Sequence, residues 1–249
     1  VDRFNTGSNP YLSDSDADGA LDWYEVAASL TNPSSAAEKP SIPYPLPDPD
    51  GSTGATNKPV KVYIMAGQSN TVGIGQTSGT ALGTLETITK RENKFPNLLD
   101  GSNNWTKRND VIYKGVVSAT AAGPLTAGQG ASSTQLGPEL GFGQVMGWYH
   151  DEPVLIIKAS QGNRSLAWDF LPPGGDRWVL ADKTYAGYGE SPANWLTASG
   201  APAPGGWYAG KQYDDCFLPE SQMGMIPWAT AMAYASGVYV RHNGAAYTS

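Results

Sequence analysis

In the middle of the chain, apolar residues occur both in short continuous runs and at helical spacing. Residues 60–67 (VKVYIMAG) form a short, largely apolar run that ends in glycine, which predicts a buried strand. Residues 154–159 (VLIIKA) predict a second buried strand, and residues 111–113 a shorter third one. Residues 140–150 carry apolar side chains at helical spacing, and Pro138 suits a first helical turn. A strand, a connection that contains a helix and another strand together predict an α/β fold with parallel strands.

The amino-acid composition changes on both sides of this region. Residues 1–39 are polar and acidic, and residues 40–58 are rich in proline and then in small polar residues, which predicts a linker. We therefore predict a main domain at 59–225, in which residues 171–210 are loop-rich, and a separate segment at 226–249.

The amino-acid composition limits which classes of protein and which partners the sequence fits. Thirty glycines and 19 prolines among 249 residues indicate many turns, while 8 Trp, 13 Tyr and 5 Phe can supply a core. The net charge of −7 argues against nucleic acid as a partner, and no apolar run reaches the roughly 18 residues of a membrane span. A single cysteine, Cys216, excludes an internal disulfide framework. Because the chain starts at Val1 without a signal-like segment, we expect a processed form or a fragment.

An acidic stretch near the start has the spacing of a calcium loop. Residues 14–25 (DSDADGALDWYE) match the pattern D-x-[DN]-x-[DN]-G-x5-E at every position. Ca²⁺ needs six to eight oxygens, and Gly19 would allow the sharp turn between them. The predicted ligands are Asp14, Asp16, Asp18, the Ala20 carbonyl, Asp22 and Glu25. The alternative is a solvated acidic turn.

This loop resembles the calcium loops of thrombospondin type 3 and dockerin repeats in secreted proteins. The resemblance covers about residues 5–33 and implies a structural Ca²⁺ and an extracellular or periplasmic location.

Ser69 is the candidate nucleophile, because it directly follows the first predicted strand in the sequence GQSN. Ligands of open α/β sheets bind beyond the carboxyl ends of the strands, where a serine can expose its hydroxyl. The segment is not a G-x-S-x-G elbow, since Thr71 occupies the second glycine position, and it is not a phosphate loop. A simple helix cap is the alternative for an isolated serine at this place.

Three ordered segments resemble the SGNH hydrolases, in the branch of sialate O-acetylesterase-like and acetylxylan-esterase-like carbohydrate esterases. They are VYIMAGQSNTVGIG from residue 62, LGPELGF from residue 136 and IIKASQGNRSLAW from residue 156. The resemblance implies a three-layer, flavodoxin-like parallel sheet and a secreted enzyme that removes acetyl esters from polysaccharides. It makes Ser69 the nucleophile and Gly162 a backbone donor to the oxyanion. Asn163 stands where the family has a second glycine and belongs to the same predicted site.

The catalytic base of that family does not carry over. Its D-x-x-H block has no counterpart, because Gly147 and Tyr239 stand three residues before the two histidines, His150 and His242. We expect His150 to cap a helix or lie on the surface, and His242 to lie at a surface hairpin turn. The sheet would then be incomplete, with an exposed edge. The alternative function is a calcium-stabilised glycan-binding or adhesive protein without catalysis; a third is a purely structural extracellular segment.

The last segment resembles the opening of small chitin-binding-type carbohydrate-binding modules, which implies a polysaccharide ligand. An ordinary β-hairpin core is the alternative. The matching positions are Trp228, Tyr234, Gly237, Val240, Asn243, Gly244 and Tyr247.

Overall fold

The computed structural model describes residues 7–9, 11–49, 51–203 and 205–216, and the backbone of 240–242 and 245–247. The chain divides into two compact units. One comprises residues 1–50 and 79–106, and the other comprises residues 51–78 and 107–249. Residues 79–106, predicted to belong to the main domain, therefore group with the N-terminal segment.

The first unit is built around an aromatic cluster rather than a sheet. Its helical elements are α1 (Asp22–Tyr24), η1 (Glu25–Ser29), η2 (Thr87–Arg91) and η3 (Pro96–Leu98). The rings of Trp23 and Tyr24 each lie 5.1 Å from that of Tyr44, and the ring of Phe95 lies 5.9 Å from it.

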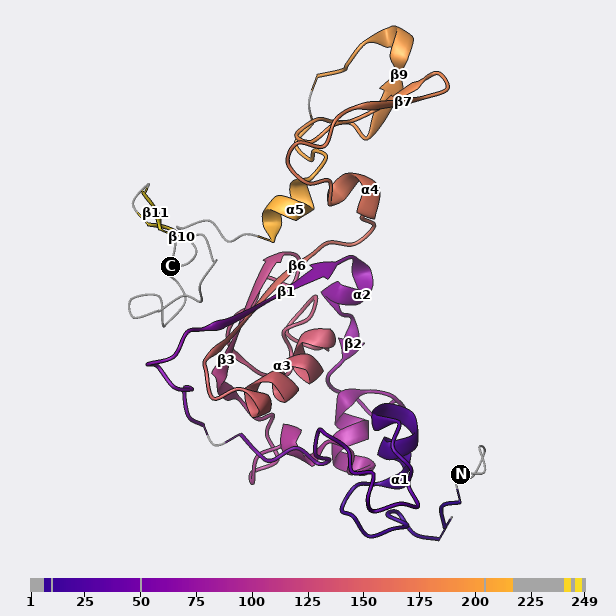
Figure 1. Ribbon diagram of the computed structural model, residues 1–249, viewed down its shortest axis with the longest axis vertical. Coiled ribbons are helices and arrows are strands. Elements are labelled where there is room, and N and C mark those ends of the chain that lie inside the picture. Colours follow the sequence, from indigo (N-terminus) through magenta and orange to yellow (C-terminus); the bar gives the residue numbers. More distant parts are fainter. Residues whose placement is uncertain are drawn as a thin grey trace. The chain divides into compact units, whose positions relative to one another are not determined.

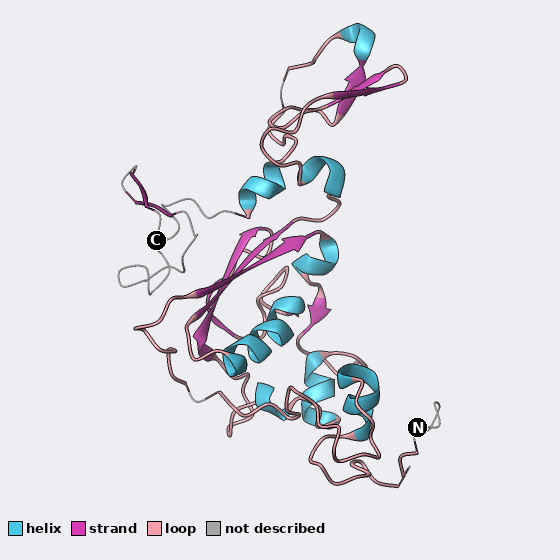
Figure 2. Cartoon of the chain, viewed as in Figure 1, coloured by secondary structure: helices cyan, strands magenta, loops and turns pink. Residues whose placement is uncertain are grey.

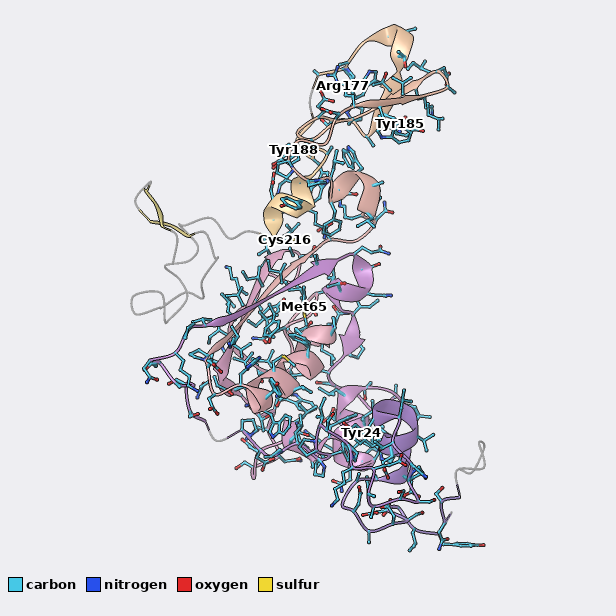
Figure 3. The ribbon with its side chains drawn as sticks, in the orientation of Figure 1. Tyr24, Met65, Arg177, Tyr185, Tyr188 and Cys216 are labelled. Atoms are coloured by element: carbon cyan, nitrogen blue, oxygen red, sulfur yellow. The ribbon has the colours of Figure 1, made fainter. Side chains whose placement is uncertain are left out.

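Tyr44 explains why the predicted linker is not a linker at its beginning. Its side chain is buried, and its hydroxyl accepts a hydrogen bond from the Phe95 backbone N–H at 3.1 Å. Proline content predicted an extended stretch but gave no sign of this ring, which packs beside Tyr24 (labelled in Figure 3).

The second unit contains a four-stranded sheet, so the predicted α/β class with parallel strands is confirmed (Figure 2). The strand order is β1 (Lys61–Gly67), β6 (Val154–Ser160), β3 (Arg108–Val117) and β4 (Ala122–Leu125). Both β1 and β3 run parallel to β6, while β4 is antiparallel to β3. Strand β3 is much longer than the predicted strand at 111–113.

Helix α3 (Pro138–Tyr149) covers one face of this sheet, close to its predicted position. Gly143 faces Leu125 and Ile156, and a Cβ at Gly143 would overlap the side chains of both. The absence of a side chain there lets the helix approach the strands closely.

The opposite face has a smaller core of Val60, Ile112, Leu155 and Ile157. Strand β6 is buried at every position, as predicted. Strand β1 alternates instead, with Val62 39% and Ile64 47% exposed, so the prediction of a fully buried strand is wrong for this face. The reason is its place at the end of the described sheet.

Shorter elements complete the second unit. They are α2 (Ser69–Val72), β2 (Gly75–Gln76) paired with β5 (Gln135–Leu136), α4 (Leu166–Asp169), β7 (Trp178–Leu180), β8 (Lys183–Tyr185), β9 (Asn194–Leu196), η4 (Thr197–Ser199), α5 (Lys211–Asp215), and β10 (Val240–His242) paired with β11 (Ala245–Tyr247). The predicted loop region 171–210 thus contains a small antiparallel sheet.

Residues 217–239, which hold most of the predicted carbohydrate-binding module, lie outside the described residues. Within the described part, no helix has the length and apolar character needed to cross a bilayer.

Candidate functional site

The carboxyl ends of β1 and β6 bring the two predicted catalytic loops together. Gly67 is the register partner of Ser160, and the backbone N–H of Gln161 donates to the Gly67 carbonyl at 3.3 Å. Ser69 follows Gly67 by two residues, and Gly162 follows Ser160 by two. Both loops therefore leave the same edge of the sheet, where α2 begins (Figure 1).

Ser69 is the first residue of α2, and its side chain is exposed. Its Oγ donates to Gln68 Oε1 at 3.1 Å. Within the described part of the chain, no imidazole is recorded in contact with this hydroxyl.

Two glycines fix the turn that carries Ser69. A Cβ at Gly67 would overlap the Thr71 side chain, which lies one turn into α2. Gly73 ends the helix with φ at +84°, and a Cβ there would overlap the backbone of Gly137. The lack of a side chain at Gly67 and Gly73 therefore makes room for the Thr71 side chain and for the Gly137 backbone beside this short helix.

The second loop has an open side and one left-handed residue. A Cβ at Gly162 would meet no atom within 4 Å, and Asn163 is exposed with φ at +58°. Asparagine tolerates this conformation better than other non-glycine residues, which suits the position where the resemblance expects glycine. Among the described residues, no hydrogen bond is recorded from the backbone N–H of Ser69 or Gly162.

A glutamine that the sequence analysis missed joins the two strand ends. Gln212 in α5 is fully buried, and its Nε2 donates to the carbonyls of Gly67 and Ala159, the latter at 3.2 Å. The local sequence KQYDD gives no signal for this contact.

A buried ion pair contacts α2, the short helix that begins at Ser69. Lys158 Nζ lies 2.6 Å from Glu139 Oε2, and both side chains are fully buried. The ammonium also donates to the carbonyls of Val72 at 3.0 Å and Gln129 at 3.3 Å. Burial lowers the pKa of Lys158, and Glu139 opposes that shift. The signal was visible in the sequence, because a lysine inside the apolar run VLIIKA requires a partner.

His150 lies away from Ser69. A hydrogen bond of 2.6 Å joins its Nε2 to the Tyr63 hydroxyl, and its side chain is only 14% exposed. Tyr63 precedes Gly67 by four residues, which is roughly 13 Å along a strand. His150 is the C-cap residue of α3, so the helix-cap alternative of the prediction is confirmed, and its side chain is largely buried. The side chain of His242 lies outside the described residues.

The acidic loop brings three of its predicted ligands together. Asp14, Asp16 and Asp18 place carboxylate oxygens within 4.8 Å of one another. Gly19 has φ at +97°, the conformation expected of the turn glycine. The Ala20 backbone N–H donates to Asp18 Oδ1 at 2.8 Å, so the turn is closed by its own side chains.

The loop also contains carboxylate oxygens without a partner. Asp16 Oδ2, Asp18 Oδ2 and Glu25 Oε2 are buried and make no hydrogen bond with any other described residue. Burial raises the pKa of Glu25, and Asp16, Asp18 and Asp22 raise it further. These oxygens fit a cation, because a buried carboxylate needs a compensating charge or donor.

Asp22, predicted to bind the cation directly or through water, is hydrogen-bonded within the loop. Both of its oxygens accept hydrogen bonds from Ser15, one from the backbone N–H at 2.7 Å and one from Oγ at 2.6 Å. In this structure Asp22 organises the loop.

Comparisons of the chain with protein-family models, curated proteins and solved structures gave no match. The function therefore has to be argued from the residues and the geometry of this chain.

Proposed function

We propose that the chain is a serine hydrolase of the carbohydrate-esterase type, which removes acetyl esters from glycans outside the cytoplasm. The parallel pairing of β1 with β6 is the observation that supports this proposal, since it places the Ser69 and Gly162 loops at one sheet edge. The resemblance to SGNH hydrolases, with their three-layer sheet, assigns the same two residues.

The proposed reaction needs a nucleophile, two donors and a base. Ser69 Oγ attacks the ester carbonyl, while the backbone N–H groups of Ser69 and Gly162 stabilise the oxyanion. The base takes the proton of Ser69 and gives it to the sugar oxygen, which leaves as a hydroxyl when the ester C–O bond breaks. Water then hydrolyses the acetyl-serine and releases acetate. His150 is too far along the sheet, so His242 is the imidazole left in the sequence for this role.

Acetate release from p-nitrophenyl acetate and acetylated xylan, with Ca²⁺ present, tests the proposal. Ser69→Ala should abolish release, and His242→Gln should reduce it by about two orders of magnitude or more. His150→Gln is the matched control and should stay within twofold of the wild type. Equal release by the wild type and Ser69→Ala, with both shown to be folded, would contradict the proposal.

A glycan-binding protein without catalysis is the second candidate. Trp178 is 51% exposed and stacks on Tyr185 across β7 and β8, with ring centroids 4.0 Å apart. Exposed aromatic rings can pack against sugar rings. Titration calorimetry with xylan oligosaccharides would then show binding that Trp178→Ala weakens and Ser69→Ala leaves intact, with no acetate released by either protein.

We also propose that the acidic loop holds a structural Ca²⁺. Asp14, Asp16, Asp18 and Glu25 would provide side-chain oxygens, as supported by the unpartnered oxygens of three of them. Calcium titration followed by calorimetry should give one site, which Glu25→Gln weakens at least tenfold. Glu38→Gln, an exposed position outside the loop, is the matched control. Unchanged heats in Glu25→Gln would assign the loop as a solvated turn.

A further inference from the structure

The loop at residues 161–165 is anchored at both ends. At its start, the Gln161 backbone bonds to the Gly67 carbonyl, and its side-chain Oε1 accepts a hydrogen bond from Ser118 Oγ. At its end, the Ser165 backbone N–H donates to Asp169 Oδ2 at 2.6 Å. Gly162 lies between the two anchors.

The Asp169 carboxylate accepts hydrogen bonds from three residues. Its side chain is 3% exposed and accepts from the Ser165 backbone, from Trp207 Nε1 at 2.7 Å and from Arg164 at 3.5 Å. A buried carboxylate is stable only when it is paired and hydrogen-bonded, and these donors meet that need. Two of the three donors belong to the loop itself.

Trp207 connects this carboxylate to a distant part of the chain. It lies 38 residues after Asp169, and the Arg164 guanidinium lies over its ring at 3.7 Å. Gly210 brings the end of the segment 169–210 back to its start, because its backbone N–H donates to the Trp168 carbonyl at 2.8 Å. The hydroxyl of Tyr188 (labelled in Figure 3) donates to Asp214 of α5 at 2.7 Å, which is a second hydrogen bond between this segment and the residues around it.

We propose that Asp169 is the positioning residue of the 161–165 loop and sets the direction of the Gly162 backbone N–H. Its catalytic consequence rests on the proposed esterase function. An oxyanion donor must lie about 2.7–3.1 Å from the developing charge, and loss of one such donor costs about 10²–10³ in kcat. Asp169 acts through Arg164, Ser165 and Trp207.

The test combines backbone amide exchange with turnover in the full chain with Ca²⁺. In Asp169→Asn, the charge is lost and one acceptor oxygen becomes a donor. Hydrogen–deuterium exchange of the peptide that contains 161–165 should then rise at least tenfold. The kcat for p-nitrophenyl acetate should fall ten- to a hundredfold, with KM within twofold. Asp176→Asn, the same change at an exposed position, should leave both unchanged.

Each outcome decides a separate point. If Asp169→Asn changes neither exchange nor kcat, the proposal is overturned. If exchange rises while kcat stays constant, the loop is held by Asp169 but does not serve the reaction, which also overturns the positioning role. If the wild type releases no more acetate than Ser69→Ala, the esterase function fails, and exchange alone decides whether Asp169 holds the loop.

A second variant protects the test against misfolding. Trp207→Phe keeps a ring beneath Arg164 but removes the indole N–H that bonds to Asp169. It should raise exchange of the same peptide by a smaller factor, about two- to fivefold. Unchanged exchange in a folded Trp207→Phe, if Asp169→Asn does not fold, would overturn the proposal.

Discussion

Replacement of Lys158 by methionine should be among the most damaging substitutions in the second unit. The side chain is fully buried, and its ammonium bonds to Glu139 at 2.6 Å and to the carbonyls of Val72 and Gln129. Methionine has a similar length but no donor. Among the described residues, the Gly137 backbone N–H, at 2.8 Å, would then be the one recorded donor left to the Glu139 carboxylate.

The expected cost follows from the charge that remains. Removal of one partner of a buried ion pair costs about 3–5 kcal/mol, because the other charge stays buried without compensation. Two carbonyls lose their donor as well, so we expect about 4 kcal/mol for Lys158→Met. That is a large part of the ~5–15 kcal/mol that stabilises a typical domain. Glu139→Gln, added in the double variant, should recover about 2 kcal/mol, since it removes the stranded charge.

Urea unfolding followed by circular dichroism, at pH 7 with Ca²⁺, measures these differences. Lys183→Met, at an exposed lysine, is the control and should change the free energy of unfolding by less than about 0.5 kcal/mol. A cost below about 1 kcal/mol for Lys158→Met would refute the reasoning. Simple additivity of Lys158→Met and Glu139→Gln would refute it too.

Three further predictions concern other parts of the chain. Gly73→Ala should cost about 3 kcal/mol in urea unfolding because of its positive φ and the overlap with neighbouring backbone, whereas Gly83→Ala, with positive φ in open space, should cost about 1 kcal/mol. Tyr44→Ala should cost about 3 kcal/mol and weaken the near-ultraviolet circular dichroism of the aromatic cluster; an unchanged spectrum would contradict that packing. In calcium-free protein the raised pKa of Glu25 favours its protonated form in the fold, so stability should fall as pH rises above about 4.5. Thermal unfolding of the wild type against Glu25→Gln checks this sign, and a difference that does not change with pH would contradict it.

Local patterns in the sequence predicted the main elements of the second unit. The apolar runs at 60–67 and 154–159 and the helical spacing at 140–150 correspond to β1, β6 and α3. The burial of β1 was predicted wrongly, because burial depends on what covers a strand and not on the strand itself. Val62 and Ile64 have the same β-branched character as the buried residues of β6 and differ only in their neighbours.

Contacts between distant residues were beyond the reach of such patterns. Composition at 40–58 predicted a linker, but the packing of Tyr44 against Phe95 depends on a segment about 50 positions later. Gln212 bonds to the Gly67 carbonyl across 145 positions, and its neighbours in the sequence are ordinary polar residues. The sequence analysis gave Asp169 no role, because one of its donors, the Trp207 indole, lies 38 positions away.

The Ser69 turn has a consistent explanation in both the sequence and the structure. Three independent contacts hold α2: Gly67 against Thr71, Gly73 against Gly137, and Lys158 against the Val72 carbonyl. At Gly67 and Gly73, any side chain would overlap neighbouring atoms. Lys158 loses hydration because it is buried, which lowers its pKa. A helix of four residues is not stable by itself, so these contacts determine where α2 lies. Because Ser69 is the first residue of α2 and is exposed, the same contacts set the position of its hydroxyl.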